Sequence, residues 1–269
     1  MIYGAIGYSI LEFSELFQNS RIILISDNHD EEYKDCGSSV PDIQIESYLE
    51  YLLNNNYVVM IEEIPSTKDL VSLFPDSSHV VNIRKLYINN KFNKNMIPID
   101  VRFELIDNHD EEYYDKQKLK DYINKISDFF LFKHNFFIGI SLYSEKIYVS
   151  ILKDHYKYLK NKYDIFEKEY NNFFENEIKD IPNKTKVIDK INEILSDIME
   201  LYTLIKIYDI LNSAEKKIII YAGLYHISNI KELLIKYYNY KEGENYGSTN
   251  MIDIHNETKC IKFIQFISE

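Results

Sequence analysis

Outside its middle section, the chain carries short apolar runs that break off abruptly at small or polar residues. A run of four to six largely β-branched residues bounded in this way predicts a buried strand. The clearest such runs are residues 22–25, 57–61, 96–99 and 217–222.

Helical spacing of apolar residues separates these runs. Ile45, Tyr48, Leu49, Leu52 and Leu53 form one stripe on a predicted helix over residues 41–56. A second helix is predicted over 66–95 with a break near Pro75, and a third over 228–238, with Ser228 as its N-cap. Apolar and polar residues alternate over 250–255 and over 259–267, which predicts a closing pair of strands.

Residues 114–212 differ, because long charged segments with apolar residues every three or four positions predict helices, most clearly over 116–133 and 186–211. Strands that alternate with helices elsewhere favour parallel pairing. The predicted fold is therefore α/β, with a central, mainly parallel sheet flanked by helices and a long helical insertion (114–212) before the last strands. No boundary is rich in Pro, Gly or Ser, so residues 1–269 are predicted to form a single domain.

Composition narrows the classes of partner. The formal net charge of −12 argues against general binding to nucleic acid or anionic membranes. The two cysteines form no CxxC pair, and no uncharged apolar stretch approaches the roughly 20 residues of a membrane helix. The N-terminal residues lack the basic start of a signal peptide, so we expect a soluble, intracellular (cytoplasmic) protein. Heavy use of Asn, Lys, Ile and Tyr indicates AT-rich coding, which fits bacteria, protists and large DNA viruses.

Three candidate functional residues follow predicted strands: His29, Glu62 and His226. The carboxyl ends of parallel strands meet at one edge of a sheet, where ligands bind in α/β proteins. Two imidazoles and a carboxylate suit a divalent ion such as Mn, Co or Zn and leave positions for water, which such an ion can activate as a nucleophile. Asp100 and Arg102, after a third strand, can hold the histidines or a substrate oxyanion, or form a structural ion pair.

The candidate residues and their neighbours also allow other interpretations. A histidine after a strand is often a loop or capping residue instead of a ligand. Of the adjacent Glu62 and Glu63, only one can face the site, and we expect the other to cap or pair at the surface. The segment 27–33 recurs letter for letter as 107–113, which indicates either two solvated acidic loops or two loops converging on a cation, with His109 as an outer residue. Motifs for dinucleotides, P-loops, zincins and hydrolase elbows are missing.

The order of these motifs resembles the TraB/Tiki-like superfamily, which is related to ChaN-like and erythromycin-esterase-like proteins. Gly223-Leu224-Tyr225-His226 matches the second motif intact, whereas the first motif has Ser26 where the family usually has Gly. The resemblance covers residues 21–102 and 217–226. It implies an α/β core and a metal-dependent hydrolase site at His29, Glu62 and His226.

The leading hypothesis is a divalent-metal-dependent hydrolase of a peptide or ester bond, acting on a peptide or a small molecule. Glu62 serves as ligand or general base, Arg102 steadies developing negative charge, and Asp100 is the third candidate catalytic residue. One alternative is a non-catalytic structural or interaction protein that keeps the fold, motivated by Ser26. Another is iron or haem binding without turnover, as the resemblance to ChaN-like proteins implies.

Overall fold

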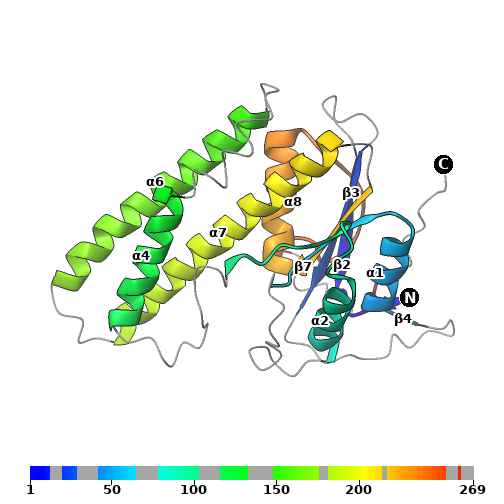
Figure 1. Cartoon of the computed structure of the whole chain (residues 1–269), viewed down its shortest axis with the longest axis horizontal. Helices are drawn as coiled ribbons and strands as arrows, with labels where there is room; N and C mark the ends of the chain where they lie inside the picture. Colours follow the sequence, from blue (N-terminus) through cyan, green and yellow to red (C-terminus); the bar gives the residue numbers. More distant parts are fainter. Residues whose placement is uncertain are drawn as a thin grey trace. The chain divides into compact units, whose positions relative to one another are not determined.

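The computed structural model describes residues 1–12, 20–28, 42–64, 78–102, 116–132, 148–175, 181–213, 217–252 and 260–261. The chain divides into two compact units (Figure 1): residues 1–100 with 209–269, and residues 101–208. The single domain inferred from the sequence stays a prediction.

The first unit is built on a six-stranded mixed sheet. Its strand order is β6 (Met96–Pro98), β5 (Val58–Ile61), β7 (Lys217–Gly223), β3 (Arg21–Asp27), β2 (Gly7–Glu12) and β8 (Lys241–Gly247). The four strands from β6 to β3 are parallel, and β2 and β8 extend the sheet in antiparallel fashion. The predicted α/β fold with parallel pairing is therefore confirmed.

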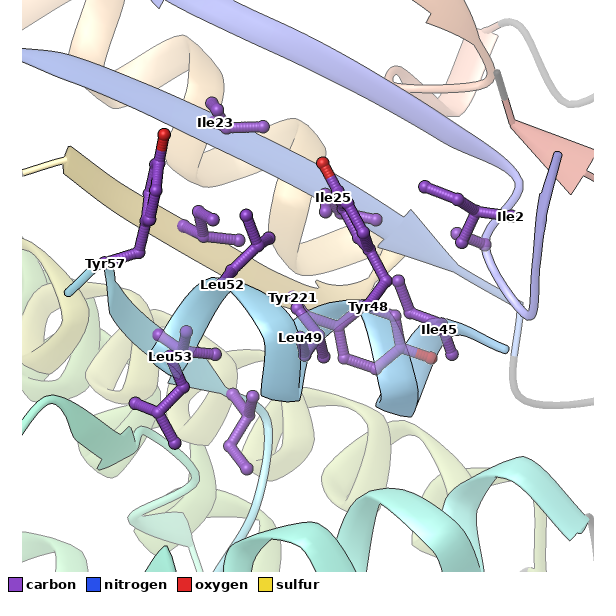
Figure 2. Packing of buried hydrophobic residues seen from close by; sticks show 14 of the residues in the cluster. Ile2, Ile23, Ile25, Ile45, Tyr48, Leu49, Leu52, Leu53, Tyr57 and Tyr221 are labelled. Carbon is purple, nitrogen blue, oxygen red and sulfur yellow. The ribbon is translucent and has the colours of Figure 1, made fainter. Parts of the chain in front are cut away.

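Helices cover both faces of this sheet. Helix α1 (Ile45–Asn54) packs with α2 (Ser78–Asn90) on one face, and α8 (Leu224–Tyr238) contacts β3 and β7 on the other (Figure 1). Alternate residues of each strand point to opposite faces. Ile23, Ile25 and Tyr221 accordingly join the core beneath α1, where they meet the apolar stripe Ile45, Tyr48, Leu49, Leu52 and Leu53 (Figure 2).

The antiparallel strands are the part of this sheet that the sequence pattern misses. β8 reads KEGENYG, with two glycines and no apolar run, and its first residues are exposed. It is a strand because its backbone pairs with β2, with a shift of register between Ser9 and Leu11, and periodicity does not detect such pairing. The predicted closing strands are only partly confirmed. Cys260–Ile261 form β9, but the strand predicted from Asn250 is wrong at its start, where Asn250 is a bend and residues 251–252 form a helical turn; the remainder lies outside the described residues.

A second, small sheet joins β4 (Ile43–Gln44), β1 (Ile2–Tyr3) and β9. Ile2 and Ile261, paired across it, extend the core that α1 covers. Cys260 in β9 is disulfide-bonded, a bond that the cysteine spacing does not predict.

The second unit is helical, as predicted for the insertion. It contains α4 (Lys116–Phe132), α6 (Tyr148–Glu175) and most of α7 (Ile181–Ser213), whose residues from Asp209 belong to the first unit. The Tyr163 hydroxyl donates to the carbonyl of Ile123, which joins α6 to α4. Lys162 lies between Glu193 and Asp197, 2.5 Å from each, and joins α6 to α7. None of the described helices is long and apolar enough to cross a membrane.

Candidate functional site

The carboxyl ends of the parallel strands bring several predicted residues to one edge of the sheet. Asp27, the last residue of β3, is in register with Gly223 of β7, and Ile61 of β5 is in register with both Tyr221 and Pro98. Glu62 and Asp100 therefore follow strands that end at the same level. This is the edge at which ligands bind in α/β sheets.

Glu62 and His226 come together at this edge. The backbone N–H of Glu62 donates to the carbonyl of Tyr221 over 2.9 Å, which continues the β5–β7 pairing by one residue. Its carboxylate Oε2 accepts the N–H of Gly223 at 2.7 Å, and its Oε1 lies 3.5 Å from His226 Nε2. The two side chains are 9% and 6% exposed. A strand end and a helix start thus hold a carboxylate and an imidazole in contact, both nearly buried.

His226 reaches this position because α8 starts earlier than the sequence predicts. The helix begins at Leu224 with Gly223 as its N-cap, so His226 lies in the first turn instead of in a turn before a helix capped by Ser228. Leu224, Ile227, Ile230 and Leu234 are buried on one side of the helix, and this spacing extends the helix back to Gly223. The free N–H groups and positive end of the helix dipole favour a carboxylate there, which explains the contact of Glu62 with Gly223.

The side chain of Glu63 points away from that of Glu62, as strand alternation predicts. The prediction that Glu63 lies at the surface is wrong. Its carboxylate Oε2 lies 2.7 Å from Arg84 Nη1, and both side chains are only 2% exposed. The same Arg84 nitrogen donates to the carbonyl of Ile64 at 3.1 Å. Burial raises the pKa of Glu63, an effect that the nearby Arg84 reduces without cancelling. The pair is an internal connection between α2 and the end of β5.

The other predicted site residues are placed as follows. Asp100 is buried beside Glu63, and its backbone N–H donates to the Glu63 carbonyl over 3.1 Å. Arg102 belongs to the second unit, so its predicted role stays a prediction. His29 and the repeated segment 107–113, including His109, lie outside the described residues.

The described part of the chain supplies two of the three predicted metal ligands. No group of three His, Cys, Asp or Glu side chains suited to a metal ion occurs among the described residues. The donor types present, one imidazole nitrogen and one carboxylate oxygen, fit Zn, Mn or Co, and His29 is the predicted third ligand.

Ser26, which stands where the TraB/Tiki-like motif usually has Gly, makes a structural contact. Its buried hydroxyl donates to the carbonyls of Ser248 and Gly7, the latter at 3.2 Å. The backbone N–H of Ser248 donates in turn to the carbonyl of Ile6 at 3.0 Å. Ser26 therefore ties residues 248–252, which we call the strap, to the sheet one residue before Asp27.

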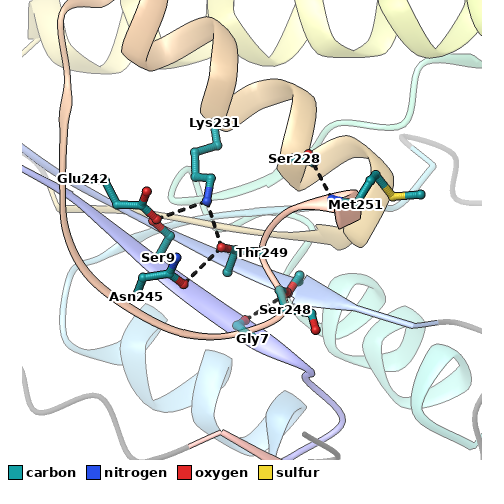
Figure 3. Close-up of polar contacts among 10 residues, drawn as sticks. Gly7, Ser9, Ser228, Lys231, Glu242, Asn245, Ser248, Thr249 and Met251 are labelled. Atoms are coloured by element: carbon teal, nitrogen blue, oxygen red, sulfur yellow. Dashed lines mark hydrogen bonds and ion pairs between the residues drawn. The ribbon is translucent and has the colours of Figure 1, made fainter. Parts of the chain in front are cut away.

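The strap is also tied to α8 by a buried lysine that sequence reasoning missed (Figure 3). Lys231 Nζ donates to Thr249 Oγ1 at 2.8 Å and lies 3.1 Å from Glu242 Oε1, on β8. Glu242 also accepts from the Ser9 hydroxyl at 2.8 Å. A lysine on the buried side of a predicted helix is the available sequence signal for such a network.

Replacing Lys231 by Met should lower the free energy of unfolding by about 2 kcal/mol, because charge-assisted hydrogen bonds are lost in a buried position. Denaturant unfolding measures the change. Lys236→Met, which removes an exposed lysine from the same helix, is the matched control and should change stability by less than about 0.5 kcal/mol. If both variants lost the same free energy of unfolding, Lys231 would stabilise the fold only through its charge and not through its buried hydrogen bonds.

Comparison of the chain with protein-family models, with curated proteins and with solved structures gave no match in any of the three. The function of the site must therefore be argued from its own geometry.

Proposed function

We propose that Glu62 and His226 form the centre of a divalent-metal-dependent hydrolytic site that acts on a peptide or ester bond. The observation that supports this most directly is the 3.5 Å contact of Glu62 Oε1 with His226 Nε2 at the carboxyl edge of the sheet. In the proposal, His29 completes the ligand set, as the resemblance to the TraB/Tiki-like superfamily implies.

The residues of the proposed site have distinct roles. A bound divalent ion supplies Lewis acidity and lowers the pKa of water. His226 offers Nε2 as a donor atom, and the first turn of α8 sets its direction. Glu62 is oriented by the Gly223 N–H, which leaves Oε1 to hold the ion or to take a proton from the attacking water. The low exposure of both side chains strengthens these interactions by excluding solvent.

A non-catalytic role is the competing proposal, and one observation favours it. Glu62 Oε2 accepts the N–H of Gly223, so this carboxylate caps α8 whether or not a metal binds. In that case Glu62 and His226 simply connect β5 to α8. A third candidate, iron or haem binding without turnover, follows from the family resemblance alone and would be recognised by a Soret band after incubation with haem.

Metal-dependent stabilisation separates these proposals. A divalent ion at 100 times its Kd should raise the free energy of unfolding by about 2.7 kcal/mol, because it binds the folded chain only. Protons compete with the ion for histidine nitrogens, so this gain should shrink as pH falls from 7 to about 5. Thermal melts with Mn, Co and Zn at both pH values provide the measurement.

Two variants locate the ion. His226→Gln, which conserves size in a buried position, and Glu62→Gln should each abolish most of the metal-dependent gain. His109→Ala is the control, since its segment repeats the letters around His29 but has no place in the family pattern. Wild-type protein that is unaffected by all three metals would support the non-catalytic role. Loss of the gain in His109→Ala would place the ion at the repeated acidic segments.

A further inference from the structure

A row of charged side chains follows the amino edge of the six-stranded sheet, the edge at which its parallel strands begin. Arg21, Lys217 and Lys241 are the first residues of β3, β7 and β8, and all three are exposed. Arg21 is in register with Lys217, so the two residues lie side by side. Lys241 is in register with Glu12, the last residue of β2, and Arg21 Nη2 lies 3.6 Å from Glu12 Oε1. The register of the strands therefore fixes the order of these charges along the edge.

The turn between α2 and β6 extends the row on the other side of β7. The carbonyl of Asn95 accepts the N–H of Val59 over 2.7 Å, so this turn lies against the start of β5, the neighbour of β7. Lys94 is exposed in the turn, next to Asn95. Phe92, two residues earlier, is 93% exposed, and Lys91 Nζ lies 5.2 Å from the centroid of its ring. An exposed aromatic ring thus lies at one end of the row.

The row carries a surplus of positive charge. We call its exposed lysines the basic edge: Lys91, Lys94, Lys217 and Lys241. None of the four forms an ion pair with another residue that the structure describes, although acids outnumber Lys and Arg by 43 to 31 in the chain. Helices α1, α2 and α8 lead into strands that begin at this edge. Each helix end carries about half a negative charge, so the three together offset less than half of the surplus.

We propose that the basic edge binds single-stranded nucleic acid, with phosphates along the lysines and a base stacked on Phe92. Proteins that bind single strands without reading their sequence combine a positively charged track with aromatic rings on which bases stack. Neighbouring strands lie about 4.8 Å apart, so the row from β6 to β8 spans about 24 Å. About seven stacked nucleotides, at about 3.4 Å each, cover this length.

The shape and the charge of this edge select the occupant. A lipid surface takes up a broad apolar face, whereas the lysines here form a line with the Phe92 ring beside it. The formal net charge of −12 argues against general binding to nucleic acid, but charges more than about 8 Å away are largely screened at physiological ionic strength. The local surplus of lysines therefore decides the interaction. The proposal is independent of the hydrolytic site, which lies at the opposite edge of the sheet.

Salt-dependent binding of a labelled single strand tests the proposal. Fluorescence anisotropy of a fluorescein-labelled oligothymidylate of about 12 nucleotides is measured with metal-free protein. Each neutralised phosphate contributes about −0.7 to the slope of log K against log salt, so four lysines should give a slope of about −2.8. The affinity should accordingly fall about 50-fold between about 50 and 200 mM salt. Absence of binding at about 100 μM protein in about 50 mM salt would overturn the proposal.

Matched lysine variants locate the bound strand. Lys217→Gln combined with Lys241→Gln should halve the salt slope to about −1.4. Lys168→Gln combined with Lys186→Gln removes the same charge from exposed positions of α6 and α7, and should leave the slope unchanged. Equal changes in the two double variants would show a general electrostatic attraction and would overturn the basic edge as the binding site.

Phe92→Ala tests the stacked base. It should weaken binding at least about fivefold, the value of one base stacked on an aromatic ring, and leave the salt slope unchanged. Tyr158→Ala removes a ring of α6 that is 61% exposed, and should have no effect. Equal effects of the two variants would overturn the stacking on Phe92. Phosphatidylserine vesicles that bind the wild-type chain in a flotation assay, when the oligonucleotide does not, would assign the edge to a lipid surface and overturn the proposal.

Discussion

Arg84→Met should lower the free energy of unfolding by about 3–5 kcal/mol at pH 7, because it leaves the Glu63 carboxylate buried without its cation. Arg84 Nη1 is 2.7 Å from Glu63 Oε2, and each of the two side chains is only 2% exposed to solvent. The removed nitrogen also satisfies the Ile64 carbonyl. Chemical denaturation at pH 7 measures the loss.

The loss should depend on pH in a defined direction. Burial holds the pKa of Glu63 in the folded protein above its unfolded value, which is about 4.3 for an ordinary glutamate. A raised pKa of this kind stabilises the fold fully below the unfolded pKa, and this contribution is lost as pH rises through the folded pKa. Without Arg84 the pKa of Glu63 rises further, so the deficit of the variant should shrink as pH falls from 7 to about 5.

The double variant Arg84→Met with Glu63→Gln is the control for this explanation. It removes the buried charge, so it should recover part of the lost stability and show little pH dependence between 5 and 7. A single variant that loses less than about 1 kcal/mol, or whose deficit is the same at both pH values, would contradict a charged pair in this position.

Gly7→Ala is expected to have the second large effect, a loss of about 3 kcal/mol. A Cβ at position 7 would lie 2.3 Å from the Ser248 carbonyl oxygen and 2.6 Å from the Ser248 nitrogen. Both are backbone atoms, held by the contacts of the strap with Ser26 and Ile6, so neither can move aside cheaply. Thermal and denaturant unfolding should both register the loss.

Gly243→Ala in the neighbouring strand is the matched control. The three atoms nearest to its Cβ would all belong to the side chain of Glu12, with Cδ at 3.0 Å, and that side chain is 57% exposed and held only by an exposed ion pair with Arg21. We expect a change of less than about 1 kcal/mol. A similar cost at both positions would mean that the clash with the strap is relieved by movement and that the strap is less firmly held than its contacts indicate.

The parallel core was predictable because burial on both faces produces uninterrupted apolar runs. The runs at 22–25 and 217–222 became β3 and β7, and the stripe from Ile45 to Leu53 became α1. Hydrophobic burial stabilises these elements, and each of them can be recognised from the spacing of apolar residues within its own segment. β8 left no such signature, because backbone pairing to β2 forms it and its first five residues are exposed.

The site was predictable only in part, for a different reason. Strand ends that carry His or Glu are visible in the sequence, and the proximity of Glu62 to His226 follows from β5 and β7 being neighbours. The partners of Glu63 and Lys231 are not visible, because Arg84 and Thr249 come from distant segments and no local pattern links them. Long-range polar pairing depends on the completed fold, so it has to be measured in the structure.

The position of β7 in the sheet has a consequence for how the chain folds during synthesis. β7 separates β3 from β5, and it is paired in parallel with both, although it is the seventh of the nine strands described. β3 and β5 leave the ribosome more than 150 residues before β7, and neither has its central neighbour until then. Contacts at such separations slow folding and keep apolar strand edges exposed for longer. The nascent chain must therefore rely on early partners, such as α1 packed on β5, or on a chaperone, until residue 223 has been made.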